Sequence, residues 1–298
     1  MKLGLQIPRF TWPGGDAAIA PELARIVRTA EEVGFDSVWV MDHFFQLRGV
    51  GAVEEPMLEG WTTLGWMAAI TTRVELGLMV GGVHYRQAPL WVKAATTLDV
   101  LSGGRAWLGI GAAWNQEESE GLGFPFPSLG ERFEQLEETL AYAHQMWSGE
   151  HGTGGTFEGR HIHATRLLNA PQSIRRPRPP IMIGGGGERK TLRLVAQYGD
   201  ACNIFGTPEK LRQKYAVLRE HCERLGRPYD EIERSTLQTV RLHPNEQGPV
   251  ETPAQTVDRF GELANAGAQT IIFNVRDVWR PGALEIIGSE ILPHLQAL

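Results

Sequence analysis

The sequence is poor in cysteine, with only Cys202 and Cys222 among its 298 residues. Two cysteines are too few for a disulfide framework, and the opening residues, MKLGLQIPRF, lack the long apolar core of a signal peptide. We therefore expect a cytoplasmic protein. No uninterrupted apolar run approaches the roughly 18 residues that a membrane helix requires, so no membrane association is expected.

Positive charge is also scarce. Lysine and arginine together number 29 against 35 acidic residues, which gives a formal net charge of −6. Without a basic excess, the chain has no field that would attract nucleic acid or an anionic membrane surface, so small molecules are the expected partners. Hydrophobic residues make up 42% of the chain, and a chain of this length can bury roughly three quarters of its unfolded surface.

Short β-type runs alternate with longer segments of helical period along the chain. Eight runs have the apolar content of strands: 2–7, 37–41, 74–80, 105–111, 180–184, 200–205, 234–240 and 270–275. Eight βα repeats in one chain of this length predict a single (β/α)8 TIM barrel spanning residues 1–298. A doubly wound sheet has the same local pattern and is the alternative.

One interval interrupts this alternation. Residues 149–180 are rich in Gly, Pro and Arg and have no helical period, so they read as an insertion before the fifth strand. Within it, TFEGRHIHA (156–164) alternates polar and apolar residues as a small hairpin does. An insertion of this length serves either as a functional lid or as a surface addition without a role in the site.

The stretch SVWVMDHFF raises the question of why an apolar strand should stop at Asp42 and His43. In a TIM barrel the active site lies at the carboxyl ends of the strands, so these ends form the candidate site. The other ends contribute residues 6–12, 79–84, 111–115, 184–187, 202–203, 239–241 and 274–277. They are rich in aromatic, glycine and amide groups and poor in acids, which favours a flat aromatic ligand over a metal ion.

The glycine run IGGGGERKT is the most distinctive local motif. It leaves a strand and enters a helix, so the amides of Gly184, Gly185, Gly186 and Gly187 can face an anion such as a phosphate. The run differs from the nucleotide-binding pattern GxxxxGK[ST], because Arg189 stands where the second glycine should be. The alternative is a βα turn that binds no ligand.

A metal site is not expected. The only HxH pair, His161 and His163, lies in the insertion, and no strand end supplies the histidines and acids that would complete a site.

Three segments resemble a known family. GFDSVWVMDHF, TLDVLSGGRAWLGIGAAWNQEE and PPIMIGGGGERKTLRLVAQYGDACN are similar to the luciferase-like monooxygenase superfamily of TIM-barrel flavoproteins. Within it they look most like the branch of oxidoreductases that depend on the deazaflavin coenzyme F420. The resemblance covers nearly the whole chain.

The resemblance implies roles for the strand ends. His43 would act as the general acid or base beside the cofactor, and a free imidazole, with a pKa of about 6.5, suits that role. The Met79–Val80 peptide bond is expected to be cis and to support the cofactor ring. The implied cofactor-binding residues are Asp42, His43, Met79, Val80, Gly111, Trp114, Asn115 and Gly184 to Gly187. The candidates to bind the acidic tail of F420 are Arg160, Arg175, Arg176, Arg178 and Arg189, and a solvated basic loop is the alternative explanation for them.

The chain departs from the sugar-phosphate dehydrogenases of this branch. They carry a catalytic Glu in a GxGxGE pattern after the fourth strand, whereas this chain has GIGAAW, with Trp114 at that position. An aromatic pocket of Trp12, Phe44, Trp61 and Trp114 would suit an apolar substrate instead, and packing in the core is the alternative for each tryptophan.

The reaction depends on the cofactor. With F420, the protein would transfer a hydride to or from a carbonyl, alcohol, imine or activated alkene, and a separate enzyme would reduce the cofactor. With FMN it would be a monooxygenase supplied by a partner reductase, and a flavin-binding protein without catalysis is the third alternative. The family also implies a homodimer, for which GWTTLGWMAAI and APLWVKAATTL offer apolar surface.

Overall fold

The computed structural model describes residues 1–242 and 250–298. Eight of its strands run parallel in one sheet, and each coincides with or overlaps a run predicted from the sequence. They are β1 (Lys2–Ile7), β2 (Ser37–Val40), β3 (Glu75–Leu78), β5 (Ala106–Gly111), β8 (Ile181–Gly184), β9 (Ala201–Asn203), β10 (Glu233–Val240) and β11 (Thr270–Val275).

The sheet closes on itself. The first strand, β1, pairs with the last, β11, with Leu3 opposite Ile271, and β3 pairs with β5 across the remaining junction. An open doubly wound sheet keeps two free edges, so this closure excludes that alternative and confirms the TIM barrel.

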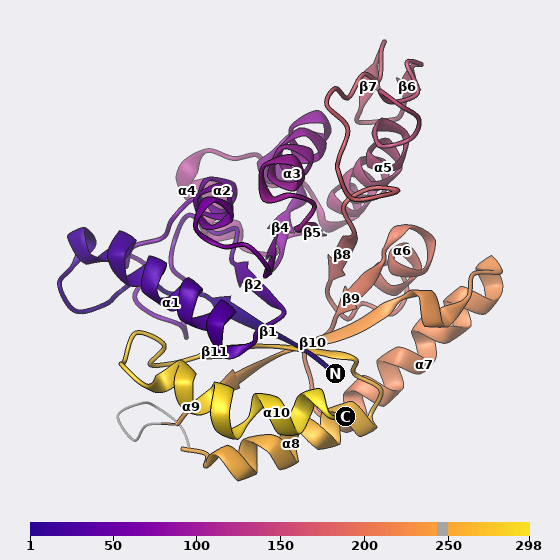
Figure 1. The fold of residues 1–298 in the computed structure, drawn as a ribbon. Coiled ribbons are helices and arrows are strands. Elements are labelled where there is room, and N and C mark those ends of the chain that lie inside the picture. The colour runs from indigo at the N-terminus through magenta and orange to yellow at the C-terminus, as the bar shows by residue number, and fades with distance from the viewer. Residues whose placement is uncertain (243–249) are drawn as a thin grey trace.

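Helices surround the barrel (Figure 1). The longer ones are α1 (Ile19–Val33), α2 (Gly60–Ile70), α3 (Ala88–Ser102), α5 (Leu129–Met146), α7 (Pro208–Leu225) and α8 (Pro253–Asn265). The shorter ones are α4 (Gln116–Leu122), α6 (Thr191–Tyr198), α9 (Ala283–Glu290), α10 (Leu292–Gln296) and the 3-10 turns η1 (Asp16–Ala18), η2 (Val83–Tyr85) and η3 (Tyr229–Glu231). In the described ranges, no helix has the length and apolarity to cross a membrane.

Side chains fill the barrel below the site. Trp39 and Trp107 lie in contact there, with ring centroids 5.8 Å apart, and they pack with the buried Met182 and Ile272. A side chain at Gly77 would place its Cβ 2.4 Å from the Trp39 ring. The interior is therefore a packed core, and only its carboxyl end is open to a ligand.

The segment before β8 contains a short antiparallel pair. Strand β6 (Phe157–Glu158) pairs with β7 (His163–Ala164), and the two stand beside α5 in Figure 1. The Glu138 carboxylate of α5 accepts hydrogen bonds from the backbone amides of Arg160 at 2.7 Å and Ile162 at 3.0 Å. These bonds attach the turn of the hairpin to the outside of the barrel.

Candidate active site

A cavity of about 590 Å³ opens at the carboxyl ends of the strands. This is the end at which TIM barrels bind their ligands, and the volume suits a small molecule or cofactor. Nine of the predicted cofactor-binding residues line it: Asp42, His43, Met79, Val80, Gly111, Trp114, Asn115, Gly184 and Gly185. Sequence reasoning did not single out other lining residues, which include Tyr85, Leu129, Phe133 and Leu237.

The predicted aromatic pocket requires a correction. Of its four members only Trp114 lines the cavity. Trp12 is buried and packs edge-on against Phe10 at 5.9 Å, and Trp61 packs in the same way against Trp91 at 6.1 Å. Trp12 follows the end of β1 and Trp61 lies in α2, and each ring packs against another aromatic ring instead of facing the cavity.

Phe44 also lies outside the cavity lining. Its ring stacks on Phe124 at 5.2 Å and meets Tyr85 edge-on at the same distance. This aromatic cluster packs against the residue after His43, and of its members Tyr85 also lines the cavity. Trp114 remains the aromatic residue at the mouth, with its ring edge-on to His43 at 5.7 Å.

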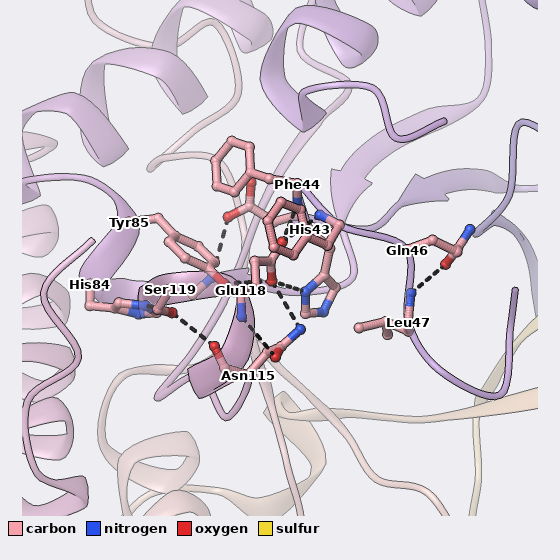
Figure 2. Close-up of polar contacts among 12 residues, drawn as sticks. His43, Phe44, Gln46, Leu47, His84, Tyr85, Asn115, Glu118 and Ser119 are labelled. Carbon is pink, nitrogen blue, oxygen red and sulfur yellow. Dashed lines mark hydrogen bonds and ion pairs between the residues drawn. The ribbon is translucent and has the colours of Figure 1, made fainter. Parts of the chain in front are cut away.

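His43 is held by a buried carboxylate. Its Nδ1 lies 2.7 Å from Oε2 of Glu118, a residue with no exposed surface. Glu118 belongs to α4, the short helix after β5, which Asn115 caps by accepting a hydrogen bond from the Glu118 amide. The site therefore joins the end of β2 to the helix after β5 (Figure 2).

Glu118 accepts hydrogen bonds from several donors besides His43. They are the backbone amides of Phe44 and, at 2.9 Å, Phe45, the Tyr85 hydroxyl at 2.8 Å and the Asn115 amide at 3.2 Å. Burial raises the pKa of the Glu118 carboxyl, but the hydrogen bonds, led by that of His43, outweigh it and hold the pKa below its usual value. Glu118 is therefore an ionised acceptor.

This arrangement determines which nitrogen of His43 faces the ligand. Because an ionised carboxylate can only accept, Nδ1 of His43 donates to Glu118. In the neutral imidazole, Nε2 then carries no proton and is the acceptor available to the cavity. Burial and the Glu118 carboxylate raise the pKa of the Tyr85 phenol, so Tyr85 also stays protonated and donates. Figure 2 shows Glu118 between these two side chains.

Asp42 lines the cavity, but its carboxylate is engaged elsewhere. Arg86 donates to both of its oxygens, at 2.7 and 2.8 Å, and also to Glu59 at 2.6 Å. Burial raises the pKa of Asp42, and the Arg86 guanidinium opposes that rise. The Asp42 side chain therefore anchors the loop after β3, and the chemistry at this strand end is left to His43.

The Met79–Val80 peptide bond is cis, which confirms the expectation from the resemblance. Strand β3 ends just before it at Leu78, earlier than the sequence predicted, and β4 (Gly81–Gly82) follows. The Val80 side chain then projects toward β8, where a Cβ at Gly184 would lie 2.5 Å from Val80 Cγ2. A glycine is therefore required at the start of the glycine run by contact with this bulge.

The glycine run turns sharply from β8 into α6. Gly185 has a φ of 116°, which glycine adopts without strain. Gly186 and Gly187 follow outside the cavity lining. A Cβ at Gly186 would find only Ile204 and Lys214 within 4 Å, the nearer at 3.4 Å. The run thus leaves open backbone next to Thr191, the first residue of α6.

Two of the predicted arginines pair with carboxylates at the starts of strands, and Arg160 pairs with Glu134 of α5. Arg175 pairs with Glu75 at the start of β3, and Arg178 pairs with Asp200 just before β9. Both therefore lie at the amino ends of the strands, away from the cavity, and the prediction that they bind a cofactor tail there is wrong. Arg189 follows the glycine run directly.

Each histidine of the HxH pair contacts a carboxylate. His161 contacts Glu134 at 3.0 Å, and His163 contacts Glu158 at 3.1 Å. In the part of the chain that the structure describes, no group of three or more His, Cys, Asp and Glu side chains could hold a metal ion.

Glu118 is the site residue that sequence reasoning missed. The segment WNQEESE carries Glu117, Glu118 and Glu120 within four positions, and nothing in the pattern distinguishes the buried one. The available signal was Asn115, a favoured N-cap residue, since the third residue after a cap lies in the first helical turn, close to the strand end.

His84, which is partly buried next to the site, should make the stability of the protein depend on pH. Burial, with the Arg132 charge, lowers its pKa from 6.5 to about 4. The folded state therefore disfavours protonated His84, and the associated stability is present above pH 6.5 and lost as the pH falls toward 4. Between pH 7 and pH 5 this group should remove about 2 kcal/mol of unfolding free energy.

Urea denaturation at both pH values, on the wild type and on His84→Gln, measures this effect. The variant should lose less stability on acidification by about that amount. An identical pH slope in the two proteins would show that His84 is not the group responsible.

The closed barrel and the cavity at the carboxyl ends of its strands define a TIM-barrel protein with its cavity where TIM barrels bind small molecules. Residues 1–251 match the luciferase-like monooxygenase family, and the chain belongs to that family.

Two relatives share the name F420-dependent glucose-6-phosphate dehydrogenase. The protein from Kineococcus radiotolerans is 35% identical over 222 residues, which cover 72% of this chain and 62% of that protein. The chain thus spans less than two thirds of the length of this relative. The protein from Nakamurella multipartita is 28% identical, with 97% of each chain covered.

Solved structures share the fold. An F420-dependent secondary alcohol dehydrogenase in complex with an F420-acetone adduct aligns with a TM-score of 0.83 at 17% identity, covering 99% of this chain and 98% of that one. The coenzyme F420-dependent tetrahydromethanopterin reductase from Methanopyrus kandleri aligns at 0.79 with 18% identity, and a monooxygenase from Streptomyces bottropensis at 0.82 with 18%; each covers 99% of both chains.

Proposed function

We propose that the protein is an oxidoreductase that transfers a hydride between coenzyme F420 and a small organic substrate. The observation that carries the proposal is the position of His43, whose Nδ1 is bound to buried Glu118 while its ring lines the cavity. A residue held in this way can accept a proton from an alcohol or return one to a carbonyl. The names of the relatives from Kineococcus and Nakamurella support F420 as the cofactor.

The residues present fit such a cofactor. Open backbone at Gly185 and Gly186, beside Thr191 at the start of α6, can receive a phosphate. The bulge at Met79 and Val80 lines the cavity next to them and can support a ring system. When bound, F420 would supply hydride transfer, and the chain's own residues would bind it, exclude water and move the accompanying proton at His43.

The substrate that we propose is an apolar carbonyl, alcohol, imine or activated alkene. Trp114 at the mouth and Leu129, Phe133 and Leu237 in the lining give the cavity apolar walls. Trp114 stands where the sugar-phosphate dehydrogenases carry their catalytic Glu, which argues against a sugar phosphate.

Side-by-side titration of the purified protein with F420, FMN and NADPH, followed by fluorescence or calorimetry, tests the proposal. A clear preference for F420 is expected, and a screen of ketones, alcohols and enones would follow. A preference for FMN would overturn it in favour of a monooxygenase served by a separate reductase. Absence of binding to all three would reject the cofactor assignment itself.

The glycine run offers a second test. Replacing Gly186 with leucine should weaken F420 binding at least about tenfold, because the side chain would occupy the space proposed for the phosphate. The fold should tolerate the change, since a Cβ there makes only ordinary contacts. Gly261→Leu on α8, where nothing lies within 4 Å, is the matched control. Equal F420 affinity in all three proteins would remove the phosphate site from the proposal.

A further inference from the structure

A second cavity adjoins the first at the carboxyl ends of β10 and β11. It has a volume of about 470 Å³ and shares Phe205, Leu237, Thr239 and Asn274 with the first cavity. The two cavities therefore lie side by side, on either side of these four residues. Because Leu237 and the half-exposed Phe205 lie at the junction, a ligand crossing from one cavity to the other meets apolar surface midway.

The charged groups that the described residues contribute to this second cavity do not balance. Among the described residues, its lining contains two guanidinium groups, Arg241 and Arg259, and one carboxylate, Glu251. Arg259 donates to both Glu251 oxygens, at 2.6 and 2.7 Å, and to Gln238 at 3.1 Å. The Glu251 charge is thus used by Arg259, and the charge of Arg241 is left over.

One nitrogen of the Arg241 guanidinium lacks a hydrogen-bond partner within the described chain. Its Nε is buried and has no hydrogen-bond partner among residues 1–242 and 250–298. Leaving a guanidinium nitrogen buried without an acceptor is unfavourable, and such groups in native structures usually have a role. A bound ligand with an acceptor oxygen would satisfy this nitrogen.

We propose that Arg241 binds a carboxylate of the substrate, so that the substrate is an apolar carbonyl, alcohol, imine or alkene with a carboxylate at the end remote from the reacting carbon. This inference rests on the proposed function. One uncompensated positive charge matches a monoanion, and the guanidinium fork binds carboxylates through paired hydrogen bonds.

The strand order indicates how long a substrate must be to contact both His43 and Arg241. Strands β1 and β11 lie between β2, which carries His43, and β10, which precedes Arg241. Three strand spacings are roughly 14 Å along the curved sheet, and less across the mouth. A substrate with an apolar body can therefore reach His43 and Arg241 at once.

Two matched pairs of probes test the assignment on the F420-loaded protein: hexanoate with hexanamide, and 3-phenylpropanoate with 3-phenylpropanamide. Calorimetric titration should give at least tenfold tighter binding of the acid in one or both pairs. Arg241→Gln should reduce the affinity for the acid about tenfold or more and change that for the amide less than twofold. The control is Arg212→Gln on α7, whose partner Glu209 is exposed; it should bind every probe as the wild type does.

Equal affinity for acid and amide in both pairs, or an acid preference that survives in Arg241→Gln, would overturn the proposal. The acidic tail of F420 is another source of carboxylates. F420 titration of Arg241→Gln distinguishes the two sources: unchanged F420 affinity is expected, and a tenfold loss would assign Arg241 to the cofactor instead. Failure of the wild type to bind F420 would instead count against the proposed function.

Discussion

Replacing His43 with alanine is expected to lower turnover by about a hundredfold or more while F420 affinity stays within about tenfold of wild type. His43 lines the cavity with Nε2 as its available acceptor, because Nδ1 is bound to Glu118. Without the imidazole, the side chain at position 43 can no longer act as a general acid or base. The measurement is kcat and KM with a substrate found in the carbonyl and enone screen, together with the dissociation constant of F420.

His43→Asn distinguishes the loss of proton transfer from the loss of stability. The asparagine amide can still donate to Glu118, so this variant should keep the stability that His43→Ala loses when it leaves a buried carboxylate one donor short. Both variants should lose turnover to a similar extent, since neither can carry a proton. Turnover like that of the wild type in either one would remove His43 from the reaction.

Replacing Glu118 with glutamine is expected to cost about 1–3 kcal/mol of unfolding free energy and at least about tenfold in turnover. The carboxylate accepts from the His43 ring, the amides of Phe44 and Phe45, the Tyr85 hydroxyl and the Asn115 amide. A glutamine supplies one acceptor oxygen and brings two donors of its own, so some of these groups lose their partner. Urea denaturation and steady-state kinetics measure the two effects.

Glu117→Gln is the matched control for this variant. Glu117 is the neighbouring residue on the same helix, but it is exposed and pairs with exposed Arg48, so its loss should change stability by less than about 1 kcal/mol. The tautomer of neutral His43, read from ¹⁵N chemical shifts, gives a readout that depends on no substrate. It should be protonated on Nδ1 in the wild type and in the control, and mixed in Glu118→Gln. An unchanged tautomer in Glu118→Gln would contradict the positioning role of this residue.

The sequence predicted the barrel well because the signals involved are local. Apolar runs such as 2–7 and 270–275 have the length and alternation of strands whatever they pair with, and both are strands in the structure. The same reasoning placed His43 and the start of the glycine run at the cavity, because in a parallel barrel every strand end meets at one rim. It failed for Trp12, which follows β1 in a loop, and for Trp61, which lies in α2, since the direction in which each side chain packs depends on its tertiary neighbours.

By itself, then, the sequence determined the succession of strands and helices, and with it the rim at which His43, Gly184 and Gly185 meet. Only the tertiary structure decided that the sheet closes by pairing β1 with β11, that Glu118 rather than Glu117 turns inward to His43, and that the Arg241 Nε is buried beside a cavity. The periodicity of apolar residues is a property of residues close together in the sequence. The strand pairing and the His43–Glu118 contact instead join residues far apart in the sequence, and the energies of such contacts and of buried groups depend on burial that exists only in the folded chain.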